Sequence, residues 1–375
     1  MTLTTDRPLS DGPAAPADAV TAPADAVTEL ADRLFEAGVA AFEMFSIYLG
    51  DRMGWYRSLA ADGPATPAEL AARTGTAERY AREWLEQQAV AGFVRAEPRG
   101  ATHRFWLPPA AAEVLTDTGS LSYLAPLARF IGGVGVQLHE LSGAYRTGGG
   151  VSWAQFGADA LTAQAEMNRP WFDRELPRVL SEQPELHALL SRPGARIADI
   201  GCGVGWSSLA LARAYPQARV IGFDIDDPSV DSARVNAAGT AEGERVRFVA
   251  SDAAELVAHG PFDVVFAFEC VHDMARPVEA LAAARAALAP GGVMVIMDEA
   301  TADAFAPDGD LVERLFYGWS ITLCLPDSLS HHGSVGTGTV MRADTLREYA
   351  TAAGFTEFGV LPTGEFGLWR FYRLG

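Results

Sequence analysis

Residues 195–206 read ARIADIGCGVGW, an apolar run followed by three glycines at alternate positions. The run Ala195–Ile200 predicts a buried strand, and a helical pattern follows the glycines. Gly201, Gly203 and Gly205 form the turn between them, where glycine lets the backbone bend sharply and approach a ligand closely. A GxGxG turn is a weak signal by itself, because many nucleotide sites contain one and NAD sites normally show GxGxxG. The residues around the other expected strands are therefore needed to identify the ligand.

Strand and helix patterns alternate through the C-terminal half of the chain. Strands are expected at residues 219–223, 246–249, 262–268 and 293–297, and helices at residues 207–215, 229–238, 277–288 and 345–353. This alternation is typical of an α/β fold with a parallel, doubly wound, Rossmann-like sheet. In such a sheet a ligand lies beyond the carboxyl ends of the strands, on the side of the glycine turn.

Acidic side chains follow the next expected strands at this same edge. Asp224, with Ile225 beside it, ends the second strand, where a carboxylate can accept hydrogen bonds from both ribose hydroxyls. Asp252 and Ala253 follow the third strand, where an acid can meet an exocyclic amine. Glu269 follows the fourth strand. The pattern indicates a nucleotide-like ligand held by acids.

These features, together with LAPGG at residues 288–292, resemble the class I S-adenosylmethionine-dependent methyltransferases. The resemblance covers about residues 170–375 and implies a cofactor-binding methyltransferase domain over residues 191–375. It implies that the glycine turn approaches the methionine portion, that Asp224 binds the ribose and that Asp252 meets the adenine. The whole cofactor-binding set expected on this basis is Asp199, Gly201, Gly203, Gly205, Asp224, Ile225, Asp252, Ala253 and Glu269. A Rossmann domain for another nucleotide is the alternative, and it would have to explain each match separately.

The N-terminal segment has a different composition. Residues 1–28 are rich in Ala, Pro, Asp and Thr and contain APADAVT twice, at residues 15–21 and 22–28. Two copies of a polar, Pro-containing segment cannot bury a core, so a disordered tail is expected. From Glu29 onward, apolar residues recur at helix spacing and predict a helix with one buried face.

Residues 29–120 predict a mainly helical, winged-helix-like domain. Its elements are expected to be a short helix that begins at Thr66-Pro67, a second helix at 77–91, and a hairpin formed by 93–95 and 103–107. Residues 62–100 contain five Arg and six Asp or Glu, whereas a domain that reads a DNA groove should be basic. Dimer contacts and coverage of an active site are therefore the expected roles. Residues 121–190 predict helices that form a linker and a lid over the pocket.

Composition excludes several classes of protein. The chain of 375 residues has a formal net charge of −19, and its 29 basic residues are all arginine. The lack of lysine excludes a Schiff base or a P-loop lysine, and the acidity argues against nucleic acid or an anionic membrane as a partner. No run reaches the roughly 20 apolar residues of a membrane helix, and the N-terminus lacks the pattern of a secretory signal. With three dispersed cysteines, a cytoplasmic protein is expected.

Candidate catalytic residues follow the fourth expected strand. His272 and Asp273 are adjacent there, and His331 and His332 fall in an expected loop at residues 326–339. Two histidines and one carboxylate are the ingredients of a facial triad, which leaves coordination positions open for a bidentate ligand. A divalent or ferric metal ion is therefore a candidate second cofactor, with either later histidine as its third ligand.

The same residues resemble the metal-dependent α-keto acid C-methyltransferases of peptide-antibiotic biosynthesis. The resemblance implies that the metal ion holds a small 2-oxo acid and stabilises its enolate, whose β-carbon takes the methyl group. Arg146, with Arg174 as the second choice, is the expected anchor for the substrate carboxylate. The resemblance also implies a homodimer that forms through the N-terminal domain.

Two alternatives remain open at this stage. His272 can be a general base, oriented by Asp273, in an O- or N-methyltransferase of a phenolic or other small secondary metabolite. The less favoured alternative is a DNA-binding regulator that only senses the cofactor, which the net acidity opposes. The two enzyme hypotheses differ in whether His331 and His332 are required.

Overall fold

The computed structural model describes residues 24–364 and 366–375. The segment 1–28, expected to be a disordered tail, lies outside the described residues except for residues 24–28. These last residues belong to helix α1 (Ala24–Arg52), so the helix begins inside the expected tail. No helix in the described ranges combines the length and hydropathy that crossing a membrane requires.

The chain divides by its internal contacts into two units, with the boundary between Phe45 and Ser46. The described part of the first unit is the N-terminal portion of α1. Its apolar side chains are exposed on the single chain, and Leu34 and Phe42 are each 73% exposed. The apolar face that the sequence predicts to be buried is therefore uncovered here.

A small helical region with a two-stranded hairpin opens the second unit. Its elements are α2 (Trp55–Ala61), α3 (Pro67–Thr74), α4 (Glu78–Val90), β1 (Arg95–Arg99), β2 (Thr102–Trp106) and α5 (Pro109–Thr116). The expected helix start is confirmed: Thr66 Oγ1 accepts from the Glu69 N–H at 3.3 Å, and Glu69 Oε2 accepts from the Thr66 N–H at 2.7 Å. Two helices followed by an antiparallel hairpin form the expected winged helix.

Helices then fill residues 125–190. They are α6 (Ala125–Val136), α7 (Leu138–Thr147), α8 (Trp153–Arg174), α9 (Leu176–Ser181) and α10 (Pro184–Leu190). Gly148 ends α7 with a φ of 74°, a left-handed conformation that glycine adopts readily at the end of a helix. Arg129 of α6 is buried and forms ion pairs with Asp51 and Glu166, so it connects α1, α6 and α8.

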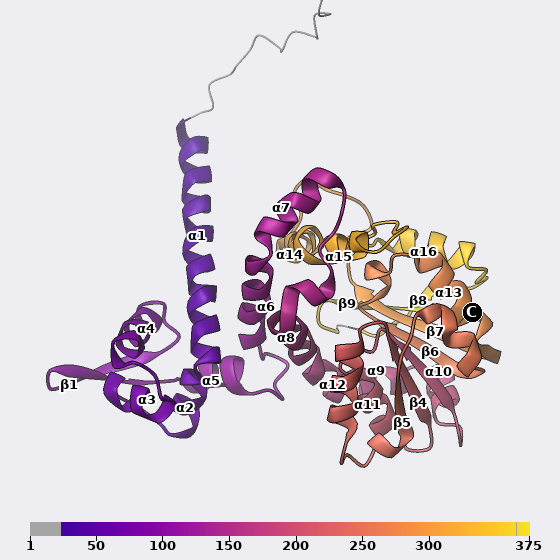
Figure 1. Ribbon diagram of the computed structural model, residues 1–375, viewed down its shortest axis with the longest axis horizontal. Helices are drawn as coiled ribbons and strands as arrows, with labels where there is room; N and C mark the ends of the chain where they lie inside the picture. The colour runs from indigo at the N-terminus through magenta and orange to yellow at the C-terminus, as the bar shows by residue number, and fades with distance from the viewer. Residues whose placement is uncertain (1–23, 365) are drawn as a thin grey trace, which may run out of the picture. The chain divides into compact units, whose positions relative to one another are not determined.

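A seven-stranded sheet forms the core of the C-terminal part (Figure 1). Its strands are β3 (Arg196–Ile200), β4 (Arg219–Asp224), β5 (Val246–Ala250), β6 (Phe262–Phe268), β7 (Leu288–Glu299), β8 (Phe358–Val360) and β9 (Trp369–Leu374). The spatial order is β5-β4-β3-β6-β7-β9-β8, and β3 to β7 run parallel while β9 is antiparallel to both of its neighbours. The expected Rossmann-like fold is confirmed, with antiparallel strands at one end.

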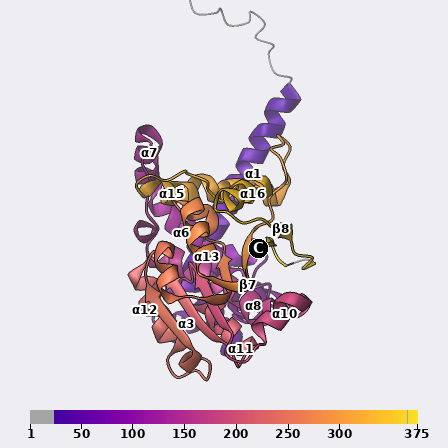
Figure 2. The same ribbon diagram turned by 90° about the vertical axis from the view of Figure 1, so that its right-hand side faces the viewer.

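Helices cover both faces of the sheet. One face packs against α9, α10 and α11 (Trp206–Ala214), and the other against α13 (Pro277–Ala286) and α16 (Ala343–Ala352) (Figure 2). Alternate residues of one strand supply the two faces, as Ile197 and Ala198 of β3 do. Helix α12 (Asp227–Ala237) packs with α11 in a smaller cluster. The sheet is therefore buried on both sides, and a ligand can reach it only at a strand end.

The segment after β7 differs from the expectation. Helices α14 (Leu311–Trp319) and α15 (Leu325–Ser330) are joined by a π-helical turn at Ser320–Cys324. The polar loop expected at residues 326–339 is thus helical at its start, and its irregular part begins at His331. This helix fixes where the two candidate histidines lie.

Candidate active site

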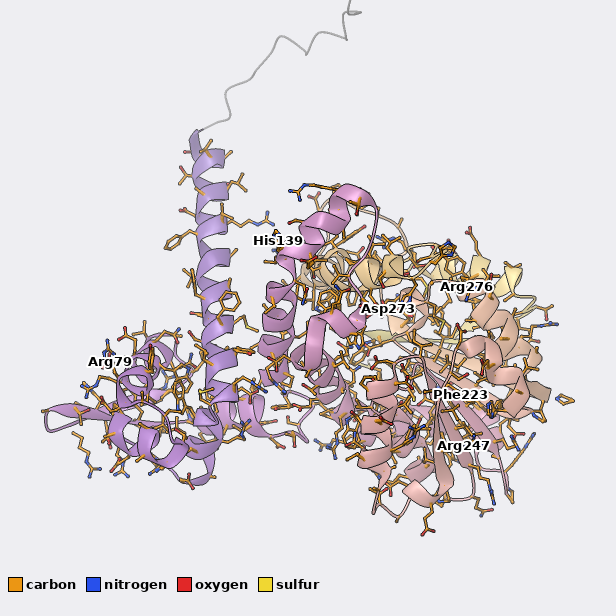
Figure 3. All side chains as sticks on the ribbon, in the orientation of Figure 1. Arg79, His139, Phe223, Arg247, Asp273 and Arg276 are labelled. Carbon is orange, nitrogen blue, oxygen red and sulfur yellow. The ribbon has the colours of Figure 1, made fainter. Side chains whose placement is uncertain are left out.

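A cavity of about 610 Å³ lies at the carboxyl ends of the parallel strands. Its wall combines the glycine turn, the segments that follow β4, β5 and β6, and side chains from α6, α8 and the α14 to α15 segment. Asp273 and Arg276 lie at this end of the sheet, whereas Phe223 lies within it (Figure 3). The position agrees with the rule that open α/β sheets bind ligands beyond their carboxyl edge.

The glycine turn is shaped by close contacts. Gly201 has a φ of 66°, and a Cβ atom there would lie 2.7 Å from Cys270 Sγ, so only glycine fits. The backbone N–H of Gly203 donates to Asp224 Oδ2 at 2.8 Å, and the N–H of Asp226 donates to Asp224 Oδ1 at 2.9 Å. Burial raises the pKa of Asp224, although these hydrogen bonds act in the opposite direction. Asp224 therefore braces the turn from the place expected for a ribose-binding acid.

Two residues of the expected cofactor set do not reach the cavity wall. Asp199 is fully buried behind the turn, where its Oδ2 accepts from Ser207 Oγ at 2.6 Å and from Ser208 Oγ at 2.5 Å. Burial raises the pKa of Asp199 to about 6. Gly205 lies beside the Phe248 ring and immediately precedes α11. Both residues shape the turn and lie outside the cavity lining.

The other expected residues of the set lie on the wall. Ile225, Asp252 and Ala253 line the cavity after β4 and β5. Asp252 Oδ1 accepts from the Ala254 N–H at 2.9 Å, which fixes the carboxylate at the start of the following turn. Its Oδ2 lies 3.8 Å from Arg276 Nη2. The structure thus brings the acids after three strands to one edge, as the parallel topology predicts.

His272 is held within a group of acids. It lies 2% exposed in a short turn after β6, and its Nδ1 lies 2.7 Å from Asp298 Oδ1 and 3.2 Å from Glu299 Oε2. Its Nε2 lies 3.4 Å from Asp273 Oδ1. Because Asp298 is the acceptor closest to Nδ1, the Nδ1–H donates to it and Nε2 is left on the side of Asp273. This is the arrangement of a base whose ring is oriented by a carboxylate.

The acids control the charge of the imidazole. Burial disfavours the protonated ring, but the carboxylates of Asp273, Asp298 and Glu299 together raise the pKa of His272 well above its usual value. Burial raises the pKa of Glu299, because this carboxyl has little solvent and a charged neighbour in Asp298. The pKa of Asp298 is lowered by the charge and hydrogen bond of His272, even though burial acts in the opposite direction. His272 and Asp298 therefore form a charged pair when the ring is protonated.

Glu269 joins the strand end to two other elements. Its φ of 49° is unusual for a residue with a side chain, and its carboxylate accepts from Gln164 and Asn168 of α8 and from Trp369 of β9. Burial raises the pKa of Glu269 to about 7. Glu269 lines the cavity, so the position expected for a cofactor-binding residue is also the point where α8 is fixed over the site.

The side of the cavity away from the glycine turn is aromatic. Phe130, Trp153 and Trp319 line it, and the Phe130 and Trp319 rings meet edge to face with centroids 6.2 Å apart. Asp327 of α15 accepts from the Trp153 N–H at 2.6 Å. Burial raises the pKa of Asp327 to about 7. This half has the apolar walls and the few polar groups of a small-molecule site.

The residues of the predicted metal triad all line the cavity, but the two later histidines lie apart from the compact groups that contain His272. His331 and His332 line the cavity, but His331 Nε2 lies 4.0 Å from Asp327 Oδ1 and is 42% exposed. Among the described residues, the groups of three or more candidate ligands with atoms within 4.8 Å of one another are His272-Asp273-Cys324 and His272-Asp298-Glu299. Neither group contains a second histidine. Both later histidines lie in the irregular segment that follows α15.

The predicted carboxylate anchor is also displaced. Arg146 lies exposed near the end of α7, where its guanidinium donates to the Ser142 carbonyl at 3.0 Å. Arg174, the second choice, donates to the Gly119 carbonyl at 3.0 Å. Neither residue lines the cavity.

Sequence reasoning missed four residues that hold the site together. Asp298 and Glu299 end β7, so the rule that identified Asp224 could have found them had the strand been extended past Met297. Asn168 and Trp369 carry no local signal, because they meet Glu269 only through the tertiary fold.

Two family models match parts of this chain. Residues 197–292 match a methyltransferase domain, and residues 40–117 match a Rv2258c-like winged HTH domain. The second match agrees with the winged helix in the structure. The Rossmann-like part of the chain therefore contains a region that matches a methyltransferase domain, preceded by a region that matches a winged helix-turn-helix domain.

Individual relatives agree with this assignment. Trans-aconitate 2-methyltransferase of Streptomyces avermitilis is 31% identical over 169 residues, which cover 45% of this chain and 59% of the relative. The chain thus spans little more than half the length of that curated relative. Human N-acetylserotonin methyltransferase in complex with S-adenosylmethionine superimposes with a TM-score of 0.69 at 17% identity, covering 94% of this chain and 98% of that one. Mitomycin 7-O-methyltransferase superimposes with a TM-score of 0.66 at 21% identity, covering 94% and 99%. At these identities the two solved structures establish the shared fold.

Proposed function

We propose that the protein is an S-adenosylmethionine-dependent methyltransferase that methylates a hydroxyl oxygen of a small molecule, with His272 as general base. The observation that carries the proposal is the His272–Asp298 contact of 2.7 Å at the wall of the cavity. It leaves the imidazole Nε2 on the side where a substrate hydroxyl can lie. The names of several similar proteins, including O-methyltransferases, support the reaction class.

The glycine-turn half of the cavity fits the cofactor. Because Gly201 has no side chain, a ligand can approach the backbone of the turn closely. The acids after β4 and β5 offer acceptors for hydroxyl and amine groups of the ligand. In the proposed complex Asp224 and Ile225 hold the ribose, Asp252 and Ala253 hold the adenine, and Glu269 faces the methionine end. When bound, S-adenosylmethionine supplies a methyl group on a positively charged sulfur, which is open to nucleophilic attack.

The acceptor half supplies the base. The acceptor hydroxyl gives its proton to Nε2 of His272 as its oxygen forms the new bond to the methyl carbon, and the bond from that carbon to sulfur breaks. Asp298 stabilises the imidazolium that results, because its carboxylate lies against Nδ1. Holding the base in one tautomer and in one orientation is the role of Asp298 in this scheme.

Metal-assisted methylation of an α-keto acid is the second candidate. The observation in its favour is that Cys324 Sγ joins His272 and Asp273 in a compact group of ligand types. A site of this composition would place a thiolate where the sequence predicts a histidine. Burial and the charge of Asp273 raise the pKa of Cys324, which opposes the thiolate form that a metal ion needs. We therefore derive no step through a metal ion.

The charge of the cavity also disfavours a carboxylic acid as the methyl acceptor. A 2-oxo acid carries one carboxylate and trans-aconitate carries three, and each needs a cation to leave water. Arg276 is the guanidinium that the described residues place on the wall, and it faces Glu279 at 3.2 Å and Asp252 at 3.8 Å. The position of Arg276 between two carboxylates therefore favours a hydroxyl compound over a 2-oxo acid or trans-aconitate as the methyl acceptor.

The deciding experiment combines the two candidates in one assay. Purified protein is incubated with S-adenosylmethionine and a panel of phenols, alcohols and 2-oxo acids, with and without a strong chelator, and products are analysed for a mass gain of one methylene. We expect chelator-resistant methylation of a hydroxyl compound that is lost in His272→Asn and retained in His331→Ala and His332→Ala. Chelator-sensitive methylation of a 2-oxo acid carbon would instead establish the second candidate.

A further inference from the structure

The wall of the cavity carries many more carboxyl groups than cations. In the described residues these carboxyl side chains are Asp224, Asp226, Asp252, Glu269, Asp273, Glu279, Glu299 and Asp327. The one guanidinium that the same residues contribute to the wall is that of Arg276. A cavity of this charge favours a cationic ligand and rejects an anionic one.

Part of this negative charge already has a counterpart. His272 lies against Asp298 and Glu299, at 2.7 and 3.2 Å. Bound S-adenosylmethionine would add a sulfonium and an ammonium against a single carboxylate, and Glu269 lies on the wall as a partner for that ammonium. Asp273 Oδ1 lies 3.4 Å from His272 Nε2 and shares the charge of that ring, whereas Asp327 forms no ion pair with His272.

Asp273 and Asp327 lie on neighbouring elements. Helix α15, which carries Asp327, packs against the turn Val271–Asp273. Asp273 Oδ1 is buried without a hydrogen-bond partner. Asp327 takes one backbone N–H, and the closest imidazole nitrogen, His331 Nε2, lies 4.0 Å away, beyond hydrogen-bond distance. Asp327 thus faces the acceptor half without a hydrogen-bonded cation of the protein, whereas Asp273 Oδ1 lies 3.4 Å from His272 Nε2.

Aromatic side chains complete the same half. Trp153, Trp319 and Phe130 line it, and the Trp153 backbone holds Asp327 in place. Aromatic faces accept a flat apolar ring, and they also attract a cationic nitrogen through their electron-rich faces. Aromatic walls together with the carboxyl group of Asp327 are therefore suited to an aryl compound that bears an amine.

We infer that the acceptor is an aromatic hydroxyl compound that carries a protonated amine, with its hydroxyl at His272 and its ammonium at Asp327. The inference rests on the proposed function, because it takes the position of the hydroxyl from the role of His272. It assigns a specificity role to Asp327, which the methyl transfer itself does not use.

Three phenols that differ only in the charge at one end test this inference. Tyramine carries an ammonium, 4-propylphenol carries a methyl group in its place, and 3-(4-hydroxyphenyl)propanoate carries a carboxylate. Binding of each compound is measured by calorimetry with S-adenosylhomocysteine present, so that no turnover is required. Methylation is measured separately by mass spectrometry, with fragmentation to distinguish the O-methyl from the N-methyl product.

Asp327→Asn is the variant that isolates the charge. The Asn carbonyl can still accept from the Trp153 N–H, so the helix contact is kept while the negative charge is removed. Asp263→Asn is the matched control, because Asp263 Oδ2 also accepts a backbone N–H, from Arg196 at 2.9 Å, and lies outside the cavity lining. Thermal unfolding of both variants confirms that each is folded.

We expect tyramine to bind most tightly and the carboxylate least tightly. Asp327→Asn should weaken tyramine binding by about 30-fold, since removing one partner of a desolvated charged pair has effects of this size, and should leave 4-propylphenol unchanged. Tyramine binding that depends on Asp327 without any methylation would support the inference while the proposed function fails. Methylation of the neutral or acidic phenol in preference to tyramine, or equal or undetectable binding of all three, would overturn the inference.

Discussion

The imidazole Nδ1 of His272 lies 2.7 Å from the carboxylate Oδ1 of Asp298, and neither side chain is more than 2% exposed. The two residues belong to different strand ends, the turn after β6 and the last residues of β7. Because both groups are buried, each controls the charge of the other more strongly than a surface pair would. The protonation of His272 is thus a property of the pair.

Asp298→Asn should weaken His272 as a base. The amide keeps a hydrogen-bond acceptor for Nδ1 but removes a negative charge that raises the pKa of His272. The base acts in its neutral form, so activity in the native protein should still be rising with pH above the usual histidine range. In the variant this rise should occur at lower pH, and the plateau in kcat should fall by about tenfold or more, because a weaker base accelerates less.

The measurement is a pH profile of kcat and kcat/KM from pH 5 to 10. Asp263→Asn is a suitable control for loss of a carboxylate distant from the imidazole. An unchanged profile in Asp298→Asn would show that His272 does not take the proton.

Asp199→Asn should change the dependence of stability on pH. Burial raises the pKa of Asp199 from 3.8 to about 6, so the folded protein holds this proton more tightly than the unfolded chain does. The stability contributed by the neutral carboxyl is therefore present at low pH and is lost as pH rises from about 4 to about 6. The Asn side chain of the variant has no charge to bury. The free energy of unfolding of Asp199→Asn, taken relative to that of the native protein, should therefore be up to about 3 kcal/mol higher at pH 8 than at pH 4.

Urea unfolding at pH 4.5, 6 and 8 measures this effect. Asp231→Asn, at an exposed carboxyl in α12, provides the comparison. A constant difference in unfolding free energy between Asp199→Asn and the native protein across this range would contradict the assignment.

Local and topological signals explain why much of the site could be predicted. Thr66 and Glu69 form a capping box at the expected helix start, and Gly201 turns where its sequence context indicates. Asp224 and Asp252 were found because parallel strands all end at one edge.

The errors come from contacts that the sequence does not encode locally. Asn168 reaches Glu269 across 101 positions of the chain, and nothing near either residue indicates the pairing. The start of the loop expected at residues 326–339 was wrong because a run that contains Pro326 and several serines predicts a loop, whereas residues 325–330 fold as α15 with the proline in its first turn. Tertiary packing at the cavity overrides the local preference there.

Arg129→Met should destabilise the protein strongly. Arg129 is 6% exposed, its Nε lies 2.8 Å from Asp51 Oδ2, and it also pairs with Glu166. Its removal leaves the Asp51 carboxylate buried with one partner fewer, so the free energy of unfolding should fall by about 3 kcal/mol. Arg52→Met is the control, because Arg52 is half exposed and its pair with Asp159 at 3.4 Å should contribute less than about 1 kcal/mol. Equal effects of the two substitutions in urea unfolding would refute the structural role of Arg129.

Helix α1 should form the contact between two copies of this chain. Phe35 and Phe42 are seven residues apart, so they lie on one side of the helix, and they are 74% and 73% exposed on the single chain. Apolar rings in this position are unfavourable in water, and a second copy of α1 would cover them.

We expect the native protein to be a dimer by light scattering coupled to size exclusion, and Phe35→Glu with Phe42→Glu to give a monomer that keeps its fold. Glu36→Gln with Glu43→Gln alters one exposed and one half-buried polar neighbour on the same helix and should remain dimeric. A dimer that survives the two glutamate substitutions would show that another surface joins the copies. A native monomer would show that no surface joins them.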